Sequence, residues 1–289
     1  TIIPGSQQFI TEAKSGQDIQ LTIDRDVQWV AAQAISDAVK SSGASSGTVI
    51  VMDPKTGAIV AHATAPTFDP NNTKKVSLDL MRNPSVQDVY EPGSTGKVMT
   101  LAAALEEKAV TPQTVFTVPY ALKTKYKVFH DHEKHPTQQL TTAGILAVSS
   151  NTGTIQIGAK LSDDTFYKYL RAFGVGKSTN SGLPGESAGL INAPKDWTGT
   201  SKPTMSFGQG YSVTAMQATS IFATIANDGV RVEPTVIAGT SDADGHYTPA
   251  KSRNSSRVIS AETAKQMRLI IESVVSAQGT APSAAIPGY

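Results

Sequence analysis

Hydrophobic and polar positions follow a helical period in the first regular stretch of the chain, from Asp24 to Lys40. The apolar residues recur three and four positions apart, and they are Val27, Val30, Ala31, Ala34, Ile35 and Val39. This spacing predicts an amphipathic helix with one face packed on a core. Residues 1–16 carry little apolar pattern and several Gly, Gln and Ser residues, so we expect a linker from an absent N-terminal region there, with regular structure from about Asp18.

Two short apolar runs, residues 48–52 and 58–61, follow this helix. Asp53-Pro54-Lys55-Thr56-Gly57 stands between them. Because Pro and Gly suit a tight reversal, the pattern predicts a β-hairpin with residues 53–57 as its turn. Two strands do not make a stable sheet by themselves, so we expect that something completing the sheet is absent from this chain.

The rest of the chain has a mainly helical pattern. It continues for about 170 residues after the hairpin. It includes a predicted helix over Thr214–Asn227, closed by Gly229. A last helix is expected over Ala261–Val274 with Ser260 as its N-cap, and no convincing strand follows it. The order of helix, hairpin and helical block predicts an α+β fold.

Composition narrows the possible partners without changing the fold class. A length of 289 residues with 39% hydrophobic content allows a sizeable core in one large domain or two smaller ones. The formal net charge of +1 gives no global field to attract nucleic acid or an anionic membrane. The sequence has no cysteine, which excludes disulfides, thiolate zinc sites and cysteine nucleophiles. Its apolar runs are all too short to cross a bilayer.

The first candidate for chemistry is the stretch 91–97, Glu-Pro-Gly-Ser-Thr-Gly-Lys, which leads into an apolar helical pattern. Ser94 then falls at a helix start, and Lys97 lies on the same face three residues later. A serine hydroxyl needs a base at neutral pH, and a lysine whose pKa is lowered by burial can be that base. The helix start also directs backbone N–H groups toward a developing oxyanion. Ser94 as nucleophile and Lys97 as base are predicted, provided that other residues support this common tetrapeptide.

The second candidate is Ser149-Ser150-Asn151, between an apolar stretch and the next helix. A turn there would present a hydroxyl and an amide. We expect Ser149 to relay protons to a leaving group, and Asn151 to hold a substrate carbonyl and Lys97. Ser-x-Asn also occurs at 178–180 and 252–254, but both lie in polar loops, for which Ser and Asn favour plain turns.

Together the two motifs resemble the active-site signature of penicillin-binding proteins and serine β-lactamases. Further segments resemble the class B penicillin-binding proteins, which are monofunctional transpeptidases, particularly the division-specific type; these segments are residues 53–57, 90–94, 183–186 and 208–211. The resemblance covers about residues 17–289. It implies a transpeptidase domain over 17–289, in which a helical subdomain adjoins an antiparallel sheet flanked by helices.

In that family a third motif, Lys-Thr-Gly on a sheet strand, lines the other side of the cleft. The resemblance implies that it follows the segment resembling residues 281–289, where this chain stops, so we expect an incomplete sheet and a domain truncated at its C-terminus. Lys55-Thr56-Gly57 has the same letters. It precedes Ser94 and falls in the predicted hairpin turn, so it is predicted to be a turn and not a catalytic motif.

The resemblance implies a peptidoglycan D,D-transpeptidase that forms a serine acyl-enzyme on D-Ala-D-Ala stem peptides, uses no cofactor and is inhibited covalently by β-lactams. It also implies the extracytoplasmic face of a bacterial membrane, an N-terminal anchor outside this chain, and partners in cell division and cell-wall synthesis. Three alternatives stay open. They are a penicillin-sensing receptor domain, a serine β-lactamase, and a scaffold that keeps the fold without activity.

Three further features bear on these alternatives. Glu186 is the candidate deacylating base of a β-lactamase, but it stands in a Leu-Pro-Gly-Glu that resembles the transpeptidases, so a structural or surface role is favoured. No motif partner accompanies His130, His132 and His135, so we expect a solvated loop or the rim of the cleft there in preference to a zinc site. For the segment Gly208–Tyr211 two roles are predicted equally, lining of the cleft and a purely structural loop.

Overall fold

The computed structural model describes residues 16–288, so the predicted linker over 1–16 lies, except for its last residue, outside the described residues. The strands are β1 (Asp18–Leu21), β2 (Gly47–Met52), β3 (Ile59–Ala65), β4 (Val115–Val118), β5 (Ala121–Lys123), β6 (Val128–His130), β7 (Gln138–Thr141), β8 (Val230–Val232), β9 (Ile237–Ser241), β10 (Tyr247–Pro249) and β11 (Ser255–Arg257). The α-helices are α1 (Arg25–Ser42), α2 (Pro84–Gln87), α3 (Lys97–Glu106), α4 (Thr142–Ala147), α5 (Asn151–Gly158), α6 (Asp163–Ala172), α7 (Ser201–Ser206), α8 (Ala215–Ala226) and α9 (Ala261–Glu272). The predicted α+β class is confirmed.

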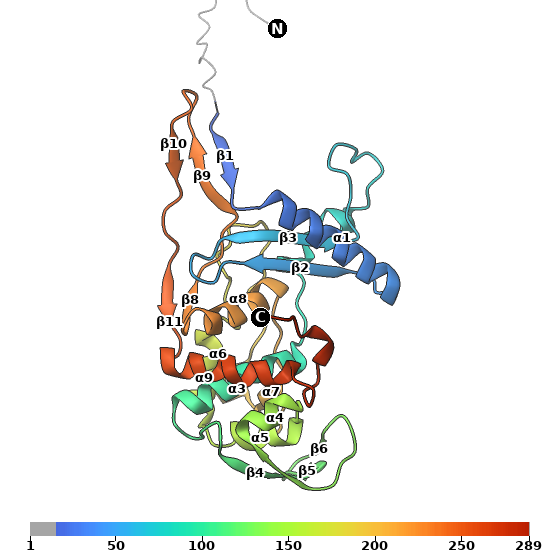
Figure 1. Ribbon diagram of the computed structural model, residues 1–289, viewed down its shortest axis with the longest axis vertical. Coiled ribbons are helices and arrows are strands. Elements are labelled where there is room, and N and C mark those ends of the chain that lie inside the picture. The colour runs from blue at the N-terminus through green and yellow to red at the C-terminus, as the bar shows by residue number, and fades with distance from the viewer. Residues whose placement is uncertain (1–15, 289) are drawn as a thin grey trace, which may run out of the picture.

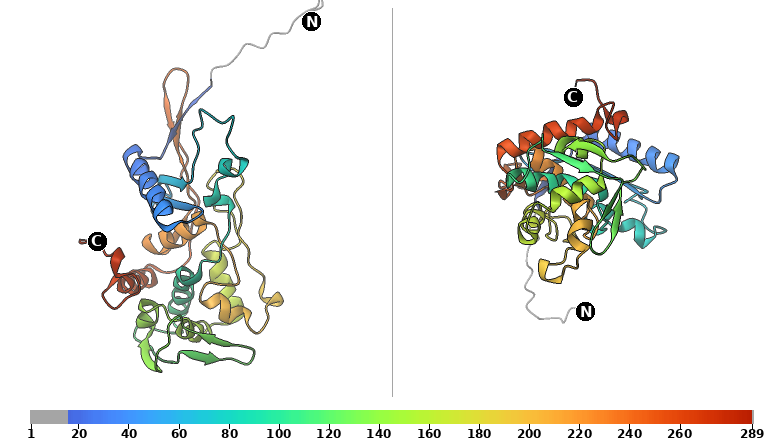
Figure 2. Two further views of the ribbon diagram at one scale, coloured as in Figure 1. Left: turned by 90° about the vertical axis from the view of Figure 1, so that its right-hand side faces the viewer. Right: turned by 90° about the horizontal axis from the view of Figure 1, so that it is seen from below.

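The described part of the molecule is elongated, with strands toward both ends and helices between them (Figure 1). An antiparallel arm with the strand order β1–β9–β10 projects at one end. The β2–β3 ribbon lies next to it with α1 packed across it, and the helical body follows. The ribbons β4–β7 and β5–β6 close the opposite end, as the side view in Figure 2 also shows.

The main hydrophobic core lies in the helical body, around α3. Every residue of α3 from Lys97 to Leu105 is buried, and the helix packs against α5, α6 and α9. A helix that is buried all round is expected to be apolar all round, and the buried part of α3 fits this with two exceptions, Thr100 and the lysine that begins it. The helix that carries Lys97 is therefore the most enclosed element of the body. No helix within residues 16–288 has the length and apolar character to span a lipid bilayer.

The predicted first helix is found as α1, but it buries a narrower face than expected. Asp24 is its N-cap, and the helix continues two residues beyond the predicted end. Ala31 and Ile35 pack on the β2–β3 ribbon. Val27 and Val30, which the pattern placed on the buried face, are 37% and 58% exposed. A slender two-stranded ribbon covers only part of the apolar stripe of a helix.

The predicted hairpin and the two later helices are confirmed. β2 pairs with β3 in antiparallel register, from Gly47 opposite Ala65 to Met52 opposite Ile59. Lys55-Thr56-Gly57 lies in the connecting turn, as predicted. The helix α8 begins after Thr214 with a capping box, and α9 begins after the N-cap Ser260.

The expectation of a helical block of about 170 residues after the hairpin is wrong at residues 115–141, which form β4 to β7. Residues 230–257, for which no strand was predicted, form β8 to β11, and all of these strands have only three to five residues each. All residues of β10 and β11 are exposed, so no period-2 pattern marks them. Their pairing depends on distant partners, such as β1 with β9, which local propensity does not encode.

Candidate active site

A cleft of about 770 Å³ lies in the helical body. Segments far apart in the sequence line it, namely residues 93–94, 131–135, 148–151 and 279–280, with Gln138, Phe207 and Gln209. Three predicted site residues, Ser94, Ser149 and Asn151, are thus brought to one cavity. Lys97 lies directly behind this lining, because it contacts Ser149.

Ser94 lies in the 3₁₀ turn η2 (Gly93–Gly96), which continues directly into α3 at Lys97. Ser94 is exposed, whereas Lys97 is completely buried. The predicted helix start and one-turn spacing are therefore confirmed. Gly208 lies against this turn, since a Cβ on it would stand 1.8 Å from the Gly93 carbonyl oxygen, and its φ is +91°. Only glycine allows so close an approach at that φ.

The Lys97 side chain is the central polar group of the site. Its Nζ donates to the Ser149 carbonyl at 2.5 Å and to Ser149 Oγ at 3.0 Å. Burial lowers the pKa of Lys97 to about 8, and the negative charge of Asp131 acts in the opposite direction. An amine with this pKa can accept a proton near neutral pH. Among the described residues Lys97 makes no hydrogen bond to the Ser94 hydroxyl, a contact that in enzymes often tightens only when substrate is bound.

Ser149 occupies the corner between α4 and α5 in an unusual backbone conformation. Its φ is +56°, in the left-handed region that residues other than glycine seldom adopt. The corner is held by backbone bonds from Ser149 to Leu146 and from Ser150 to Ile145, both 2.9 Å. This geometry turns both oxygens of Ser149 toward Lys97. A left-handed serine that contacts a buried lysine is typical of strain retained at a functional site.

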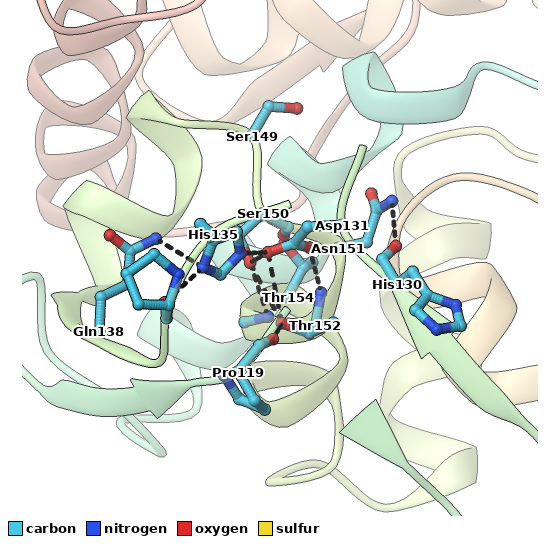
Figure 3. A network of polar contacts seen from close by, with 12 residues as sticks. Pro119, His130, Asp131, His135, Gln138, Ser149, Ser150, Asn151, Thr152 and Thr154 are labelled. Carbon is cyan, nitrogen blue, oxygen red and sulfur yellow. Dashed lines mark hydrogen bonds and ion pairs between the residues drawn. The ribbon is translucent and has the colours of Figure 1, made fainter. Parts of the chain in front are cut away.

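Asn151 is the first residue of α5. Its Nδ2 donates to the His130 carbonyl at 3.1 Å (Figure 3). The expected hydrogen bond between Asn151 and Lys97 is not formed among the described residues, because the Lys97 Nζ, which would donate to the Asn151 amide oxygen, donates instead to both oxygens of Ser149. Its predicted role toward a substrate carbonyl stays a prediction, as does the proton relay by Ser149.

Sequence reasoning missed Asp131, whose side chain is 8% exposed. It accepts hydrogen bonds from Ser150 Oγ at 2.7 Å, the Thr152 backbone N–H at 2.8 Å and His135 Nε2 at 2.9 Å (Figure 3). His135 thus bonds Asp131, a residue of the same polar segment and of no motif, and His132 and His135 lie in the cleft lining, as the cleft-rim prediction favoured. The available signal was β6, where buried Phe129 between exposed neighbours marks a strand that ends immediately before Asp131.

The Ser-x-Asn at residues 178–180 is a plain turn, as predicted. Ser178 Oγ donates to Glu186 at 2.9 Å, and Asn180 Nδ2 donates to Glu233 at 2.6 Å. Glu186 anchors this loop and does not line the cleft, which confirms its structural role. The tripeptide at 252–254 also lies outside the cleft lining.

The segment Gly208–Tyr211 serves both of the roles considered for it. Gln209 lines the cleft. Tyr211 is only 2% exposed and lies under the nucleophile turn, since a Cβ on Gly96 would stand 2.3 Å from its hydroxyl oxygen. Burial raises the pKa of Tyr211 far above its ordinary value, so this phenol stays neutral and supports η2 by packing.

In the part of the chain that the structure describes, one group of side chains has the spacing for a metal ion. It comprises Asp242, Asp244 and His246, in the turn between β9 and β10 and outside the cleft lining. Asp242 Oδ1 already accepts backbone N–H groups of that turn at 2.9 and 3.0 Å. Exposed acidic turns commonly have this arrangement, and we assign no metal to it.

Comparison with known proteins agrees with the motifs. The family model described as the penicillin binding protein transpeptidase domain matches residues 47–289. Penicillin-binding protein PbpB of Mycolicibacterium smegmatis is 40% identical over 295 residues, which cover 100% of this chain and 46% of the relative. Peptidoglycan D,D-transpeptidase FtsI of Escherichia coli is 33% identical over 224 residues, which cover 76% of this chain and 37% of the relative. The chain therefore spans less than half the length of these curated relatives.

Solved structures agree with the same assignment. Penicillin binding protein 3 from Mycobacterium tuberculosis, complexed with aztreonam, has a TM-score of 0.94 and 36% sequence identity, covering 98% of this chain and 64% of that chain. A peptidoglycan synthetase from Bifidobacterium adolescentis has a TM-score of 0.86 and 33% identity, covering 94% of this chain and 50% of that chain. The predicted family resemblance and fold are confirmed, and this chain belongs to the penicillin-binding protein transpeptidase domain family.

Proposed function

We propose that this domain is a peptidoglycan D,D-transpeptidase that works through an acyl-enzyme on Ser94. One observation carries the proposal: a completely buried Lys97 lies one helical turn from an exposed Ser94 and donates to Ser149 at the same cleft. Nucleophile, base and relay are thus adjacent, as acyl transfer requires. The name of the FtsI relative, peptidoglycan D,D-transpeptidase, supports the reaction class.

In the first half-reaction Ser94 Oγ bonds to the penultimate D-Ala carbonyl carbon of a stem peptide. Lys97, as the neutral amine, takes the hydroxyl proton. The peptide C–N bond breaks, and the proton reaches the departing D-Ala amine through the Ser149 hydroxyl, which is 3.0 Å from Lys97 Nζ. The Ser94 backbone N–H at the helix start stabilises the oxyanion, and Asn151 holds a substrate carbonyl.

In the second half-reaction an amine of another stem peptide attacks the ester carbonyl. Lys97 accepts a proton from this amine and returns it to Ser94 Oγ as the C–O bond breaks. The products are a new amide cross-link and the free serine. A β-lactam forms the same ester, but its leaving nitrogen stays tethered through the opened ring. The M. tuberculosis structures in complex with aztreonam and with ampicillin support β-lactams as ligands of this cleft.

The alternatives differ in what happens after acylation. A β-lactamase needs a base that activates water, and the candidate Glu186 is instead held in its loop by Ser178 and by the Thr179 backbone N–H at 2.7 Å. Hydrolysis therefore has the weaker support. A penicillin-sensing domain would be acylated without an acceptor amine, and a scaffold would not be acylated at all.

The proposal extends to location and partners. A peptidoglycan substrate places the domain on the extracytoplasmic face of a bacterial membrane. Attachment through an N-terminal anchor, and contacts with cell-division and cell-wall synthesis proteins, rest on the family resemblance alone. These points are independent of the geometry of the cleft.

Transfer to an amine acceptor tests the proposed reaction. The full-length protein is incubated with a stem peptide ending in D-Ala-D-Ala and an added primary amine, and the products are separated by mass. We expect D-Ala release together with the donor–acceptor amide, and neither product with Ser94→Ala. Acylation by penicillin without any amide product would favour the sensor, and rapid turnover of penicillin would favour the β-lactamase.

A further inference from the structure

The carboxylate of Asp131 forms the centre of a polar cluster beside the cleft. It stands immediately after β6, and it receives hydrogen bonds from a hydroxyl, a backbone N–H and an imidazole (Figure 3). Its side chain is 8% exposed. A buried carboxylate that accepts several hydrogen bonds, here also one from the Thr152 hydroxyl at 3.4 Å, is strongly held in place.

Two of these donors belong to the first turn of α5. Ser150 is the N-cap of that helix, since its Oγ accepts the Gly153 backbone N–H at 2.9 Å. The same hydroxyl donates its proton to Asp131, which also accepts the Thr152 backbone N–H. A negative charge at this position also complements the positive end of the helix dipole.

His130, the residue before Asp131, holds the third residue of this turn, Asn151. The His130 carbonyl accepts the Asn151 side-chain amide at 3.1 Å. All three residues from 150 to 152 are therefore bonded to residues 130 and 131. Ser149, the neighbour that contacts Lys97 through both oxygens, is joined by a single peptide bond to this fixed turn.

The charge of Asp131 also acts on Lys97. Burial lowers the pKa of the Lys97 ammonium, and the Asp131 carboxylate raises it. The other titratable groups around the cluster are Tyr120, whose ring packs against His130 and His135, and those of the segment 130–135, namely His130, His132, Glu133, Lys134 and His135. Of these, His135 touches the carboxylate. Its two ring nitrogens face acceptors, the Pro136 carbonyl at 2.7 Å and Asp131 at 2.9 Å, which favours the imidazolium and raises the pKa of His135.

We propose that Asp131 is a positioning residue of the acyl-transfer site, which fixes the Ser149–Asn151 corner against Lys97 and places a negative charge near that lysine. The inference rests on the proposed function, because it assigns Asp131 a role in the reaction of Ser94. Asp131 lines the cleft but makes no hydrogen bond to Ser94, so it acts through the corner that it holds by Ser150 and Thr152, and through its charge on Lys97.

Acylation by a fluorescent penicillin, measured as a rate against pH in the full-length protein, tests this role. Asp131→Asn keeps the size and one acceptor but removes the charge, and Asp131→Glu keeps the charge. For Asp131→Asn we expect a maximal rate lower by about tenfold or more, from misplacement of the corner. We also expect the midpoint of the rise in rate to move to lower pH, because the Lys97 pKa falls without the carboxylate. Asp131→Glu should retain the wild-type midpoint.

Glu186→Gln is the matched control. Glu186 likewise accepts a backbone N–H and hydroxyls beside a Ser-x-Asn, but away from the cleft. We expect it to lower the thermal midpoint while leaving the maximal rate and the pH midpoint unchanged. A wild-type rate and pH midpoint in Asp131→Asn would overturn the proposal, and so would equal changes in Glu186→Gln. If the wild-type protein itself were not acylated at Ser94, the proposed function would fall first and this role with it.

Discussion

The corner at residues 149–151 and the loop at residues 178–180 share the letters Ser-x-Asn and much of their geometry. Each contains a left-handed residue, Ser149 with a φ of +56° and Asn180 with a φ of +60°. Each is also bound to a carboxylate that accepts both a hydroxyl and a backbone N–H, Asp131 in the first and Glu186 in the second. Neither the tripeptide nor its anchor therefore distinguishes the two regions.

The difference is a buried cation. Ser149 meets the completely buried ammonium of Lys97. The Asn180 carbonyl accepts from Arg253, whose side chain is 30% exposed, and the Asn180 amide donates to the carboxylate of Glu233. The residue in the left-handed position differs as well, since asparagine adopts that conformation readily and serine does not. Under the proposed function, the reactive region is therefore the one in which the buried helix α3 places Lys97 in contact with the left-handed Ser149.

The largest expected effect is on the base. Lys97→Ala should slow acylation by a fluorescent penicillin roughly 10²–10⁴-fold, the usual contribution of a positioned general base. In the wild type the rate should rise with pH through about 8 and then level off, because the neutral amine is the active form. Lys177→Ala removes an exposed lysine beside the other loop and should change neither property. Unchanged acylation in Lys97→Ala would mean that another residue is the base.

The second effect compares the two serines. Ser149→Ala removes a hydrogen bond to a charged group, worth about 1.5–3 kcal/mol, so transfer to an amine should fall about 10- to 100-fold. Ser178→Ala removes the bond to Glu186 and the hydroxyl that accepts the Asn180 backbone N–H, and should cost about 1.5–3 kcal/mol of unfolding free energy with no change in rate. Equal rates in the two variants would remove Ser149 from the proton path.

The smallest effect concerns backbone strain and is measured by thermal or denaturant unfolding. Ser149→Gly should lower activity, but its free energy of unfolding should exceed that of Ser149→Ala by roughly 0.5–1 kcal/mol. Both variants lose the hydroxyl that accepts from Lys97, and only glycine accepts a positive φ without steric cost. Asn180→Gly should bring no gain over the wild type, since asparagine tolerates the conformation and its bond to Glu233 is lost. A Ser149→Gly variant no more stable than Ser149→Ala would contradict the view that strain is retained at this corner.

The sequence was sufficient for the parts of this fold whose signals are local. Apolar periodicity located α1, α8 and α9, and turn chemistry located the β2–β3 hairpin. The predicted spacing of Ser94 and Lys97 was correct because one helical turn fixes it. Local signals did not predict the strands β8 to β11, because each strand depends on the distant segment with which it pairs. They also did not predict the exposure of Val30, because the buried face of α1 depends on the ribbon that packs against it.

Asp131 shows the same limit within the site. No motif marks it, and its role appears only when β6 ends beside the first turn of α5. The bond from the Asn151 amide N–H to the His130 carbonyl arises from the same juxtaposition. Short motifs predict which residues meet, but their hydrogen-bond partners depend on tertiary packing.

The central claim is that Ser94 is the residue acylated by β-lactams and substrate. Mass spectrometry of the full-length protein after reaction with labelled penicillin tests it directly. We predict one adduct on the peptide that contains Ser94, and no adduct in Ser94→Ala. Labelling of Ser94→Ala at undiminished yield would contradict the account.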